Sequence, residues 1–461
     1  MIRELFEKQS AFKLGLRLSD ARVRIAKLRK LKESIKQHEQ RVYDALAADL
    51  RKSSFEAAVT EVLFVYGELD HAISNLEKWM RPKSAGRSMT SFFAKSRIRH
   101  EPKGVCLILS PWNYPFQLVM SPLISAIAAG NCVFIKPSEL SSATSRVICE
   151  IISSSFDERE VVCLEGDKEL ATQLLELPFD HIFFTGSTPI GKVVMAAAAK
   201  NLTSCTLELG GKSPAVVTGN TDITTAAERI IWGKLVNAGQ TCIAPDYVLV
   251  QRDQLDAFIM AAKTAILKMF FIDGKLNEDA YCKIINKHHY DRLESSLAQA
   301  LNLGAKMHFG GCKEPEKLTI APVLITDLPP NATLLEEEIF GPILPILTYN
   351  RLEEAIDHIN LRPKPLAAYL FSGSKDDQRA FISQTSAGGT CVNDVLVHIS
   401  SPKLPFGGVG PSGQGSSHGY FGFKAFSHER SIMYQSSISF SKMAYPPYHE
   451  KGWVLSLLKK L

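Results

Sequence analysis

The stretch Gly104-Val-Cys-Leu-Ile-Leu-Ser-Pro-Trp-Asn-Tyr-Pro115 decides the fold of this 461-residue chain. Its first part, from Val105 to Leu109, is an unbroken apolar run, which is typical of a strand buried on both faces of a parallel sheet. Similar runs occur at residues 132–135 and 181–184, and helical stretches separate the three. This alternation predicts a parallel, doubly wound α/β sheet.

The same pattern starts again after about residue 209. Pro214-Ala-Val-Val217 and Tyr247-Val-Leu-Val250 are apolar runs with helical stretches between and after them. They predict a second α/β unit that extends to about residue 390. Residues 18–80 carry apolar side chains three and four positions apart, which predicts helices, and the polar segment 84–101 favours a β-hairpin or an extended arm.

Composition narrows the class of protein. The chain is 45% hydrophobic and 22% charged, as globular proteins are. Its 53 basic and 48 acidic residues leave a net charge of +5, which is too small to indicate a nucleic-acid partner. No apolar stretch reaches the ~18 residues of a membrane-spanning helix, and the N-terminus lacks a secretory signal pattern. We expect no integral membrane segment, and for the apolar C-terminal residues 453–461 a packed terminal helix.

The nine cysteines indicate a reducing environment. Their number is odd and no two form a CxxC pair, so we expect neither a disulfide framework nor a structural zinc site. No cluster of His, Cys and Asp has the spacing of metal ligands, so we expect no metal. A cytoplasmic location fits this pattern.

Cys242 lies in the segment Asn237-Ala-Gly-Gln-Thr-Cys-Ile-Ala-Pro245. A lone cysteine is more often buried filler than a nucleophile. Here small residues precede it, which we interpret as a flexible approach that leaves the sulfur accessible. A catalytic cysteine needs such access and surroundings that favour the thiolate.

Two other segments carry groups that would suit such a nucleophile. Glu208, in Leu207-Glu-Leu-Gly-Gly-Lys-Ser-Pro214, stands among apolar residues, and an apolar setting raises a carboxyl pKa toward that of a base useful near neutral pH. A solvated glutamate at a strand end is the alternative. Asn113 follows the strand 105–109 in a proline-stiffened loop, where its amide could stabilise an oxyanion or only satisfy loop backbone.

The segment Phe184-Thr-Gly-Ser-Thr-Pro-Ile-Gly191 follows the third strand and predicts a helix start, with Pro189 in the first turn. Gly186 and Gly191 would let a phosphate approach the helix N-terminus. The spacing is neither the GxGxxG of dinucleotide folds nor a P-loop, so this signal is weak when taken alone.

Acidic and basic residues at two further strand ends suit a sugar. Lys136 and Glu139 follow the strand 132–135 and could bind ribose hydroxyls, or could belong to a solvated loop. Glu336-Glu-Glu-Ile-Phe-Gly-Pro342 begins as an exposed acidic run would, but its apolar continuation indicates that at least one carboxylate turns inward.

In their order along the chain, these six segments resemble the NAD(P)-dependent aldehyde dehydrogenase superfamily, and the resemblance covers nearly the whole sequence. The absence of a long N-terminal extension resembles the class 3 branch. So do the segments Cys242-Ile-Ala-Pro-Asp-Tyr247, Val392-Asn-Asp-Val-Leu-Val-His398, Leu404-Pro-Phe-Gly-Gly-Val-Gly410 and Tyr445-Pro-Pro-Tyr448.

The resemblance implies a reaction and the residues that carry it. Cys242 attacks an aldehyde, the Asn113 amide and the Cys242 N–H hold the oxyanion, hydride passes to the nicotinamide, and Glu208 activates the water that hydrolyses the thioester. Glu338 is the alternative base. The cofactor-binding residues implied are Lys136 and Glu139 at the adenosine ribose, Gly186, Ser187 and Gly191 near the pyrophosphate, and Glu338 and Phe340 at the nicotinamide.

The resemblance also implies an architecture and an assembly. Residues 1–83 and 102–208 would form a dinucleotide-binding domain, residues 209–394 a catalytic domain, and residues 84–101 with 395–461 a bridging arm and tail that mediate a homodimer. We expect NAD as the cofactor, with NADP possible, because Glu139 would repel a 2′-phosphate. The expected substrate is a medium- or long-chain aliphatic or an aromatic aldehyde.

Three other functions remain open at this point. An enzyme that transfers the acyl group to coenzyme A would need no base to activate water. Release of acid without coenzyme A therefore distinguishes the hydrolysing enzyme from the acyl-transferring one. A thiol esterase would be the primary activity only if NAD(P) did not bind. A non-enzymatic structural protein would have a thiol that is silent to mild alkylation.

Overall fold

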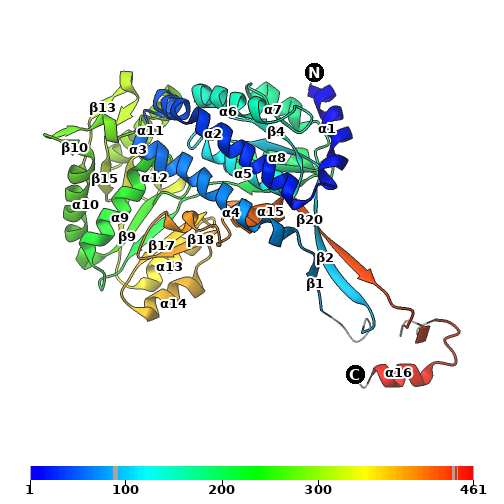
Figure 1. The fold of residues 1–461 in the computed structure, drawn as a ribbon. Coiled ribbons are helices and arrows are strands. Elements are labelled where there is room, and N and C mark those ends of the chain that lie inside the picture. The colour runs from blue at the N-terminus through cyan, green and yellow to red at the C-terminus, as the bar shows by residue number, and fades with distance from the viewer. Residues whose placement is uncertain (1, 87–91, 439–441, 444, 460–461) are drawn as a thin grey trace.

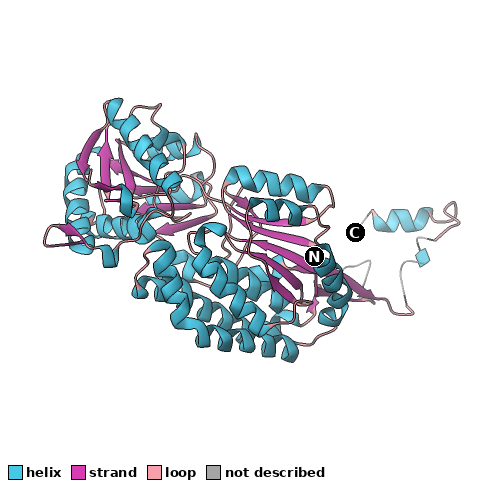
Figure 2. Ribbon diagram, turned by 90° about the horizontal axis from the view of Figure 1, so that it is seen from above, coloured by secondary structure: helices cyan, strands magenta, loops and turns pink. Residues whose placement is uncertain are grey.

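A computed structural model of the chain describes residues 2–86, 92–438, 442–443 and 445–459. The predicted arm and tail, 84–101 and 395–461, each include some residues outside these ranges. Within the described residues the chain forms two large sheets with helices on both faces and a long narrow arm that projects from them (Figure 1; Figure 2). The predicted α/β class is confirmed.

The first large sheet has six strands in the order β19-β7-β6-β3-β4-β5. Five of them are parallel, and β19, from near the C-terminus, adds to the edge antiparallel to β7. In chain order the strands are β3 (Val105–Leu109), β4 (Cys132–Lys136), β5 (Val161–Cys163), β6 (His181–Thr185), β7 (Ser204–Glu208) and β19 (Gly413–Gln414). All residues of β3 and β4 are buried, as their apolar runs predicted.

Helices cover this sheet on both faces (Figure 2). The N-terminal helices begin where capping side chains allow, because Asp20 caps α2 and Ser53 caps α3. The helices of this unit are α1 (Ile2–Arg17), α2 (Ala21–Leu50), α3 (Ser54–Ala57), α4 (Leu63–Met80), α5 (Gln117–Ala129), α6 (Ser142–Ser155), α7 (Lys168–Leu175), α8 (Thr188–Ala199) and α15 (Gly419–Ala425). Between α3 and α4 one π-helical turn, η1 (Ala58–Val62), widens the helix.

The second large sheet has seven strands in the order β12-β15-β16-β9-β8-β17-β18. All its pairs are parallel except β12 with β15. The strands are β8 (Pro214–Val217), β9 (Tyr247–Gln251), β12 (Lys306–Phe309), β15 (Val323–Thr326), β16 (Ile343–Tyr349), β17 (Ala367–Phe371) and β18 (Gly389–Val392). The helices around it are α9 (Ile223–Leu235), α10 (Leu255–Phe270), α11 (Lys287–Asn302), α12 (Thr333–Glu336), α13 (Leu352–Asn360) and α14 (Lys375–Gln384).

Three small sheets complete the described structure. Two are hairpins, formed by β10 (Phe271–Ile272) with β11 (Lys275–Leu276) and by β13 (Lys313–Glu314) with β14 (Thr319–Ile320). The third is the arm, in which β2 (Lys95–Pro102) pairs antiparallel with β1 (Lys83–Ser84) and with β20 (Ser427–Tyr434). The C-terminal helix α16 (Gly452–Leu458) lies beyond the arm, apart from both large sheets (Figure 1). We had expected this helix to pack against the rest of the chain, and it does not pack on either sheet.

Part of the predicted tail therefore lies elsewhere. β19 extends the first sheet, and α15 packs against α4 and α5, which cover that sheet. The domain limits that we predicted, including 395–461 as arm and tail, stay a prediction. No helix among the described residues is both long and apolar enough to cross a bilayer.

Candidate active site

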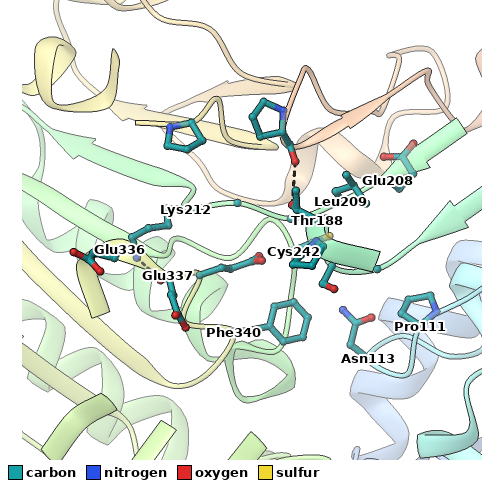
Figure 3. A pocket seen from close by; sticks show the side chains of 18 of the residues that line it. Pro111, Asn113, Thr188, Glu208, Leu209, Lys212, Cys242, Glu336, Glu337 and Phe340 are labelled. Carbon is teal, nitrogen blue, oxygen red and sulfur yellow. Dashed lines mark hydrogen bonds between the residues drawn. The ribbon is translucent and has the colours of Figure 1, made fainter. Parts of the chain in front are cut away.

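A cavity of about 1,200 Å³ lies between the two large sheets, at the carboxyl ends of β3 and β6 in the first sheet and at the amino ends of β8, β9, β16 and β17 in the second. Seven of the predicted site residues line it: Asn113, Gly186, Ser187, Glu208, Cys242, Glu338 and Phe340. Figure 3 shows Asn113, Glu208 and Phe340 arranged around Cys242. The other three, Lys136, Glu139 and Gly191, are not among its lining residues.

The turn before Cys242 is tightly held, and our interpretation of it as a flexible approach is wrong. Asn237, Ala238 and Gly239 are buried and all have φ between 52° and 77°, in the left-handed region. A Cβ at Gly239 would lie 2.3 Å from the Gly341 carbonyl oxygen, so only glycine fits there. A backbone held in this unfavourable conformation needs dense packing, and such turns are typical of functional sites.

The Cys242 side chain is half-buried and borders the cavity. Burial, with the nearby carboxyls of Glu338 and Glu208, raises the pKa of the thiol to about 12, and the backbone N–H groups of Cys242 and Ile243 offset this only in part. Without a ligand the sulfur is therefore a thiol near neutral pH. A base or a cation at the site is needed to produce the thiolate.

Asn113 is fixed through both its side chain and its backbone. Its amide nitrogen donates a hydrogen bond to the Gln240 carbonyl at 3.0 Å, and its own carbonyl accepts one from the Asn237 side chain at 2.8 Å. The hydroxyls of Tyr114 and Thr241 are 2.7 Å apart and join the same two loops. The loop after β3 and the cysteine turn thus form one connected unit.

A buried ion pair supports this unit from behind. Lys52 and Glu61 are wholly buried, with Nζ 2.7 Å from Oε1. The Lys52 ammonium also approaches the Asn113 carbonyl at 3.5 Å and the Tyr114 ring at 4.2 Å. The second Glu61 oxygen accepts the N–H groups of residues 116 and 117, where α5 begins. Glu61 lies in the π-helical turn η1.

Glu208, at the end of β7, is 4% exposed. Neither carboxylate oxygen has a hydrogen-bond partner of acceptable geometry among the described residues. Burial raises the pKa of Glu208 to about 8, and the nearby Ser417 hydroxyl offsets this in part. This is the raised carboxyl pKa that its apolar neighbours in sequence predicted.

Of the three acidic residues 336–338, the last one is half-buried and the other two are exposed. Burial and the charge of Asp246 raise the pKa of Glu338 to about 8, while Gly211, Lys212 and Arg292 lower it in part. A Cβ at Gly210 would lie 2.2 Å from the Glu338 carboxylate, so this glycine lets the carboxylate lie against the backbone.

The segment that carries Glu338 is anchored by two cations. Lys212 pairs with Asp246 and donates to the carbonyls of Leu334 and Glu337. Arg292 donates to the Ile339 carbonyl at 2.7 Å. Next to it, the Phe340 ring meets Trp112 edge-on at 5.4 Å between centroids, which makes one aromatic wall of the cavity.

The start of α8 offers backbone donors to the cavity. Ser187 precedes the helix without capping it through its side chain, and Gly186, Ser187 and Pro189 all line the cavity. Gly191 has a packing role instead, because a Cβ there would lie 2.7 Å from the Leu209 side chain.

Lys136 and Glu139 form an ion pair of 2.5 Å at the end of β4. Lys136 is nearly buried, whereas Glu139 is 44% exposed. The pair thus presents hydrogen-bonding groups to the solvent side of the carboxyl end of the sheet, outside the boundary of the large cavity.

A second, apolar cavity of about 220 Å³ also reaches Cys242 and Glu208. Its walls are largely apolar, and most of the residues that form them do not line the large cavity. They include Phe64, Tyr114, Trp232 and Phe406. Cys242 therefore lies where a large cavity with polar groups meets a small apolar one, which suits one polar and one apolar reactant.

Several residues of the site escaped the sequence analysis. Lys212 and Trp112 lie inside the quoted segments, so the segments pointed to them without assigning a role. Lys52, Glu61 and Arg292 lie in ordinary helical patterns, and nothing local separates them from solvated charges. Their roles depend on contacts with residues distant in sequence.

Comparisons with known proteins agree with this geometry. Residues 5–432 match the model of the aldehyde dehydrogenase family. The chain is 44% identical to aldehyde dehydrogenase family 3 member H1 of Arabidopsis thaliana, over 95% of this chain and 90% of that protein. It is 43% identical to the 4,4′-diaponeurosporen-aldehyde dehydrogenase of Staphylococcus aureus, over 98% and 97% of the two chains. The substrate-bound structure of Staphylococcus aureus AldH has a TM-score of 0.95 and 41% identity, with 99% of each chain covered.

Proposed function

Because this chain belongs to the aldehyde dehydrogenase family and oxidises aldehydes to carboxylic acids, we propose that Cys242, Asn113 and Glu208 carry the reaction. One observation supports this most: Cys242 lies where the two cavities meet, beside a buried carboxyl with a pKa of about 8. The apolar cavity would admit the aldehyde, and the large cavity the dinucleotide.

The residues of the large cavity suit a nicotinamide dinucleotide. The N-terminus of α8, with Gly186 and Ser187, can receive a pyrophosphate. Glu338 can accept ribose hydroxyl protons beside the aromatic wall of Phe340 and Trp112. When bound, the nicotinamide supplies the acceptor for the hydride.

Asn113 and the Cys242 N–H act in the first chemical step. The Cys242 thiol first gives its proton to a deprotonated carboxylate nearby, Glu208 or Glu338, which passes it to solvent. As the sulfur then adds to the aldehyde carbon, the C=O π pair moves to oxygen, and these two donors stabilise the negative charge that develops there. A preorganised donor of this kind contributes about 3–4 kcal/mol. Because Asn113 is already fixed by its hydrogen bonds, it need not reorganise during the step.

Glu208 acts in the second step. After hydride loss Cys242 carries a thioester, and in its deprotonated form Glu208 takes a proton from the water that attacks it. The acid then leaves and the sulfur is free again. Glu338 is the other buried carboxyl nearby, but its segment is anchored by Lys212 and Arg292, which favours a binding role.

For the cofactor we propose NAD, with use of NADP possible. Glu139 would repel a 2′-phosphate, which favours NAD. Its pairing with Lys136 neutralises part of that charge, which makes the exclusion incomplete.

One assay tests the reaction and the cofactor. Wild type and Cys242→Ser are mixed with NAD or NADP and a panel of aldehydes from two to twelve carbons plus benzaldehyde, without coenzyme A. We expect reduced nicotinamide and free acid from wild type only, faster with NAD. Acyl transfer that requires coenzyme A, or turnover that survives in Cys242→Ser, would contradict the proposed roles.

The apolar walls support a substrate with a hydrophobic chain or ring, of medium or long length. Each methylene that leaves water gains about 0.8 kcal/mol, so KM should fall as the chain lengthens until the cavity is filled. In the same panel, acetaldehyde as the best substrate would contradict this assignment.

We further propose a homodimer located in the cytoplasm. The arm supports the dimer, because one edge of β20 pairs with no strand of the described residues and β20 bears exposed large apolar residues, Met433 and Tyr434. All nine cysteines lie in the described part of the chain and are free thiols, as suits a reducing compartment.

A further inference from the structure

Two of the free thiols lie far closer together than ordinary neighbours. The sulfur of Cys149, on α6, is 2.7 Å from that of Cys163, the last residue of β5. Unbonded heavy atoms normally stay ~3.5–4.0 Å apart. Among the nine cysteines, all within the described residues, this is the one sulfur–sulfur contact.

We propose that Cys149 and Cys163 are an oxidation site that forms a reversible intramolecular disulfide when the enzyme meets a peroxide. A disulfide has its sulfurs 2.03–2.05 Å apart, so they need to close by only about 0.7 Å. Both side chains are partly exposed, which gives the oxidant access.

The chemistry balances with hydrogen peroxide as the oxidant. One thiolate attacks a peroxide oxygen, the O–O bond breaks, and a sulfenic acid and hydroxide form. The second sulfur attacks the sulfenic sulfur, the S–S bond forms and the S–O bond breaks, and the second oxygen leaves as water. Overall, two thiols and one peroxide give one disulfide and two waters. Burial, with Cys149 and Glu165 nearby, raises the pKa of Cys163 well above its usual range, which disfavours Cys163 as the attacking thiolate.

The position of the pair connects it to the cofactor site. Cys163 pairs in register with Ile135, the residue before Lys136, and the N–H of the next residue, Leu164, donates to the Ile135 carbonyl. Helix α6 follows directly after η3 (Glu139–Ser141), which begins with Glu139. A bond between Cys149 and Cys163 therefore ties together the strand and the helix that flank the Lys136–Glu139 pair.

We expect oxidation to change two properties of the protein. Linking residues 149 and 163 closes a short loop and should raise Tm by roughly 3–6 °C. Closing the sulfurs shifts the elements beside Lys136 and Glu139, so NAD binding should weaken by about threefold or more. This second effect rests on the proposed function.

The experiment uses the full chain with Cys242→Ser, so that oxidation of the nucleophile cannot interfere. It is treated with hydrogen peroxide, and peptides are mapped by mass spectrometry without reduction. Tm and the Kd for NAD are measured before and after treatment, and again after dithiothreitol. C149S and C163S are compared with C312S, a matched control at an exposed cysteine without a sulfur neighbour.

We expect a peptide that links residues 149 and 163 with loss of two hydrogens, and shifts in Tm and Kd that dithiothreitol reverses. C312S should behave as the parent does, and both other variants should lose the effect. Sulfenic or mixed-disulfide products without the link would overturn the site, and a link without a change in Kd would overturn its effect on the cofactor. The mapping needs no cofactor, so a reduced protein that binds no NAD would contradict only the proposed function.

Discussion

At the scale of single residues, the base that we propose, Glu208, would combine a kinetic benefit with a thermodynamic cost. Its carboxyl is buried without a hydrogen-bond partner of acceptable geometry among the described residues, and its pKa is about 8. Below that pH it is neutral and cannot accept a proton from water. Above it, the site holds an unpaired buried charge. Both consequences can be measured on one variant.

The first prediction concerns pH dependence. In wild type, thioester hydrolysis should become faster as pH rises through about 8, because only deprotonated Glu208 acts as a base. Glu208→Gln should lower the hydrolysis rate by about 100-fold or more and remove this pH dependence, while the initial burst of reduced nicotinamide remains. Rapid-mix kinetics from pH 6 to 9 separates burst from turnover. A variant that keeps the pH profile would move the base to Glu338, and Glu338→Gln provides that comparison.

The second prediction concerns stability. The folded pKa of Glu208 lies above its ordinary value of 4.5, so the folded state binds more protons than the unfolded state between pH 4.5 and about 8. Stability contributed by this group is therefore lost as pH rises through that window. Glu208→Gln removes the loss and should raise the free energy of unfolding at pH 8.5 by roughly 2–4 kcal/mol. Urea unfolding at pH 5 and pH 8.5 tests this, and equal effects at both pH values would contradict it.

Single residues differ in how well the sequence revealed them. Cys242, Glu208 and Asn113 stand in segments whose glycines and prolines mark special backbone, so a chemical role could be predicted for each before the structure, and these roles stay predictions. The conformation of Gly239 and its neighbours could not be predicted, since it depends on the Gly341 carbonyl about a hundred residues away. From the sequence, the small residues before Cys242 indicated a flexible backbone, whereas in the fold they allow close packing.

At the scale of elements, the π-helical turn η1 directs Glu61 inward. A π turn shifts the helical phase of a helix, and such turns are frequent at functional sites. Here it places one carboxylate between the Lys52 ammonium and the first N–H groups of α5. The loop with Asn113 lies directly before that helix, so the ion pair fixes the helix start and the loop together.

The third prediction concerns this ion pair. Lys52→Met leaves Glu61 charged and buried, and should cost about 3–5 kcal/mol of folding free energy. Lys52→Met with Glu61→Leu removes both charges, so stability should largely return, while kcat stays reduced by about tenfold or more because Asn113 loses its support. Unfolding curves and aldehyde turnover are compared for both variants. Full recovery of kcat in the double variant would show that the pair acts on stability alone.

Elements also differed in how well they could be predicted. Strands buried on both faces leave an unmistakable apolar run, and β3, β4, β6, β8 and β9 all lie where such runs stand. The Gly- and Ser-rich tail gave no comparable signal. β19 and α15 form within this tail because other elements provide a free sheet edge and an apolar surface. A local sequence pattern does not show such contacts.

At the scale of the whole molecule, the arm is the part where a single chain leaves a strand edge and large apolar side chains exposed. It projects from the first α/β unit as a three-stranded sheet, with helix α16 beyond it (Figure 1). Trp453 is 64% exposed there, and Met433 and Tyr434 are exposed on β20. An exposed edge strand with large apolar side chains is usually covered by a partner.

The fourth prediction tests that assembly. Wild type should elute as a dimer, whereas Met433→Lys with Tyr434→Lys should be a monomer, because two charges would be buried at the contact. Lys200→Glu, an exposed position at the end of α8, is the control and should stay dimeric. Light scattering after gel filtration gives the mass of each. A wild type that is monomeric at all concentrations, or a double variant that stays dimeric, would refute the arm as the contact.

The position of Cys242 between two cavities has a consequence for how the enzyme can be inhibited. Two reactants that occupy different cavities next to one sulfur do not compete for the same space. An alkyl compound that fills the apolar cavity should therefore compete with the aldehyde and leave the apparent affinity for the dinucleotide unchanged, and an adenosine analogue should show the reverse pattern. With this pattern of inhibition, each cavity could be blocked independently by a compound that fits its own lining.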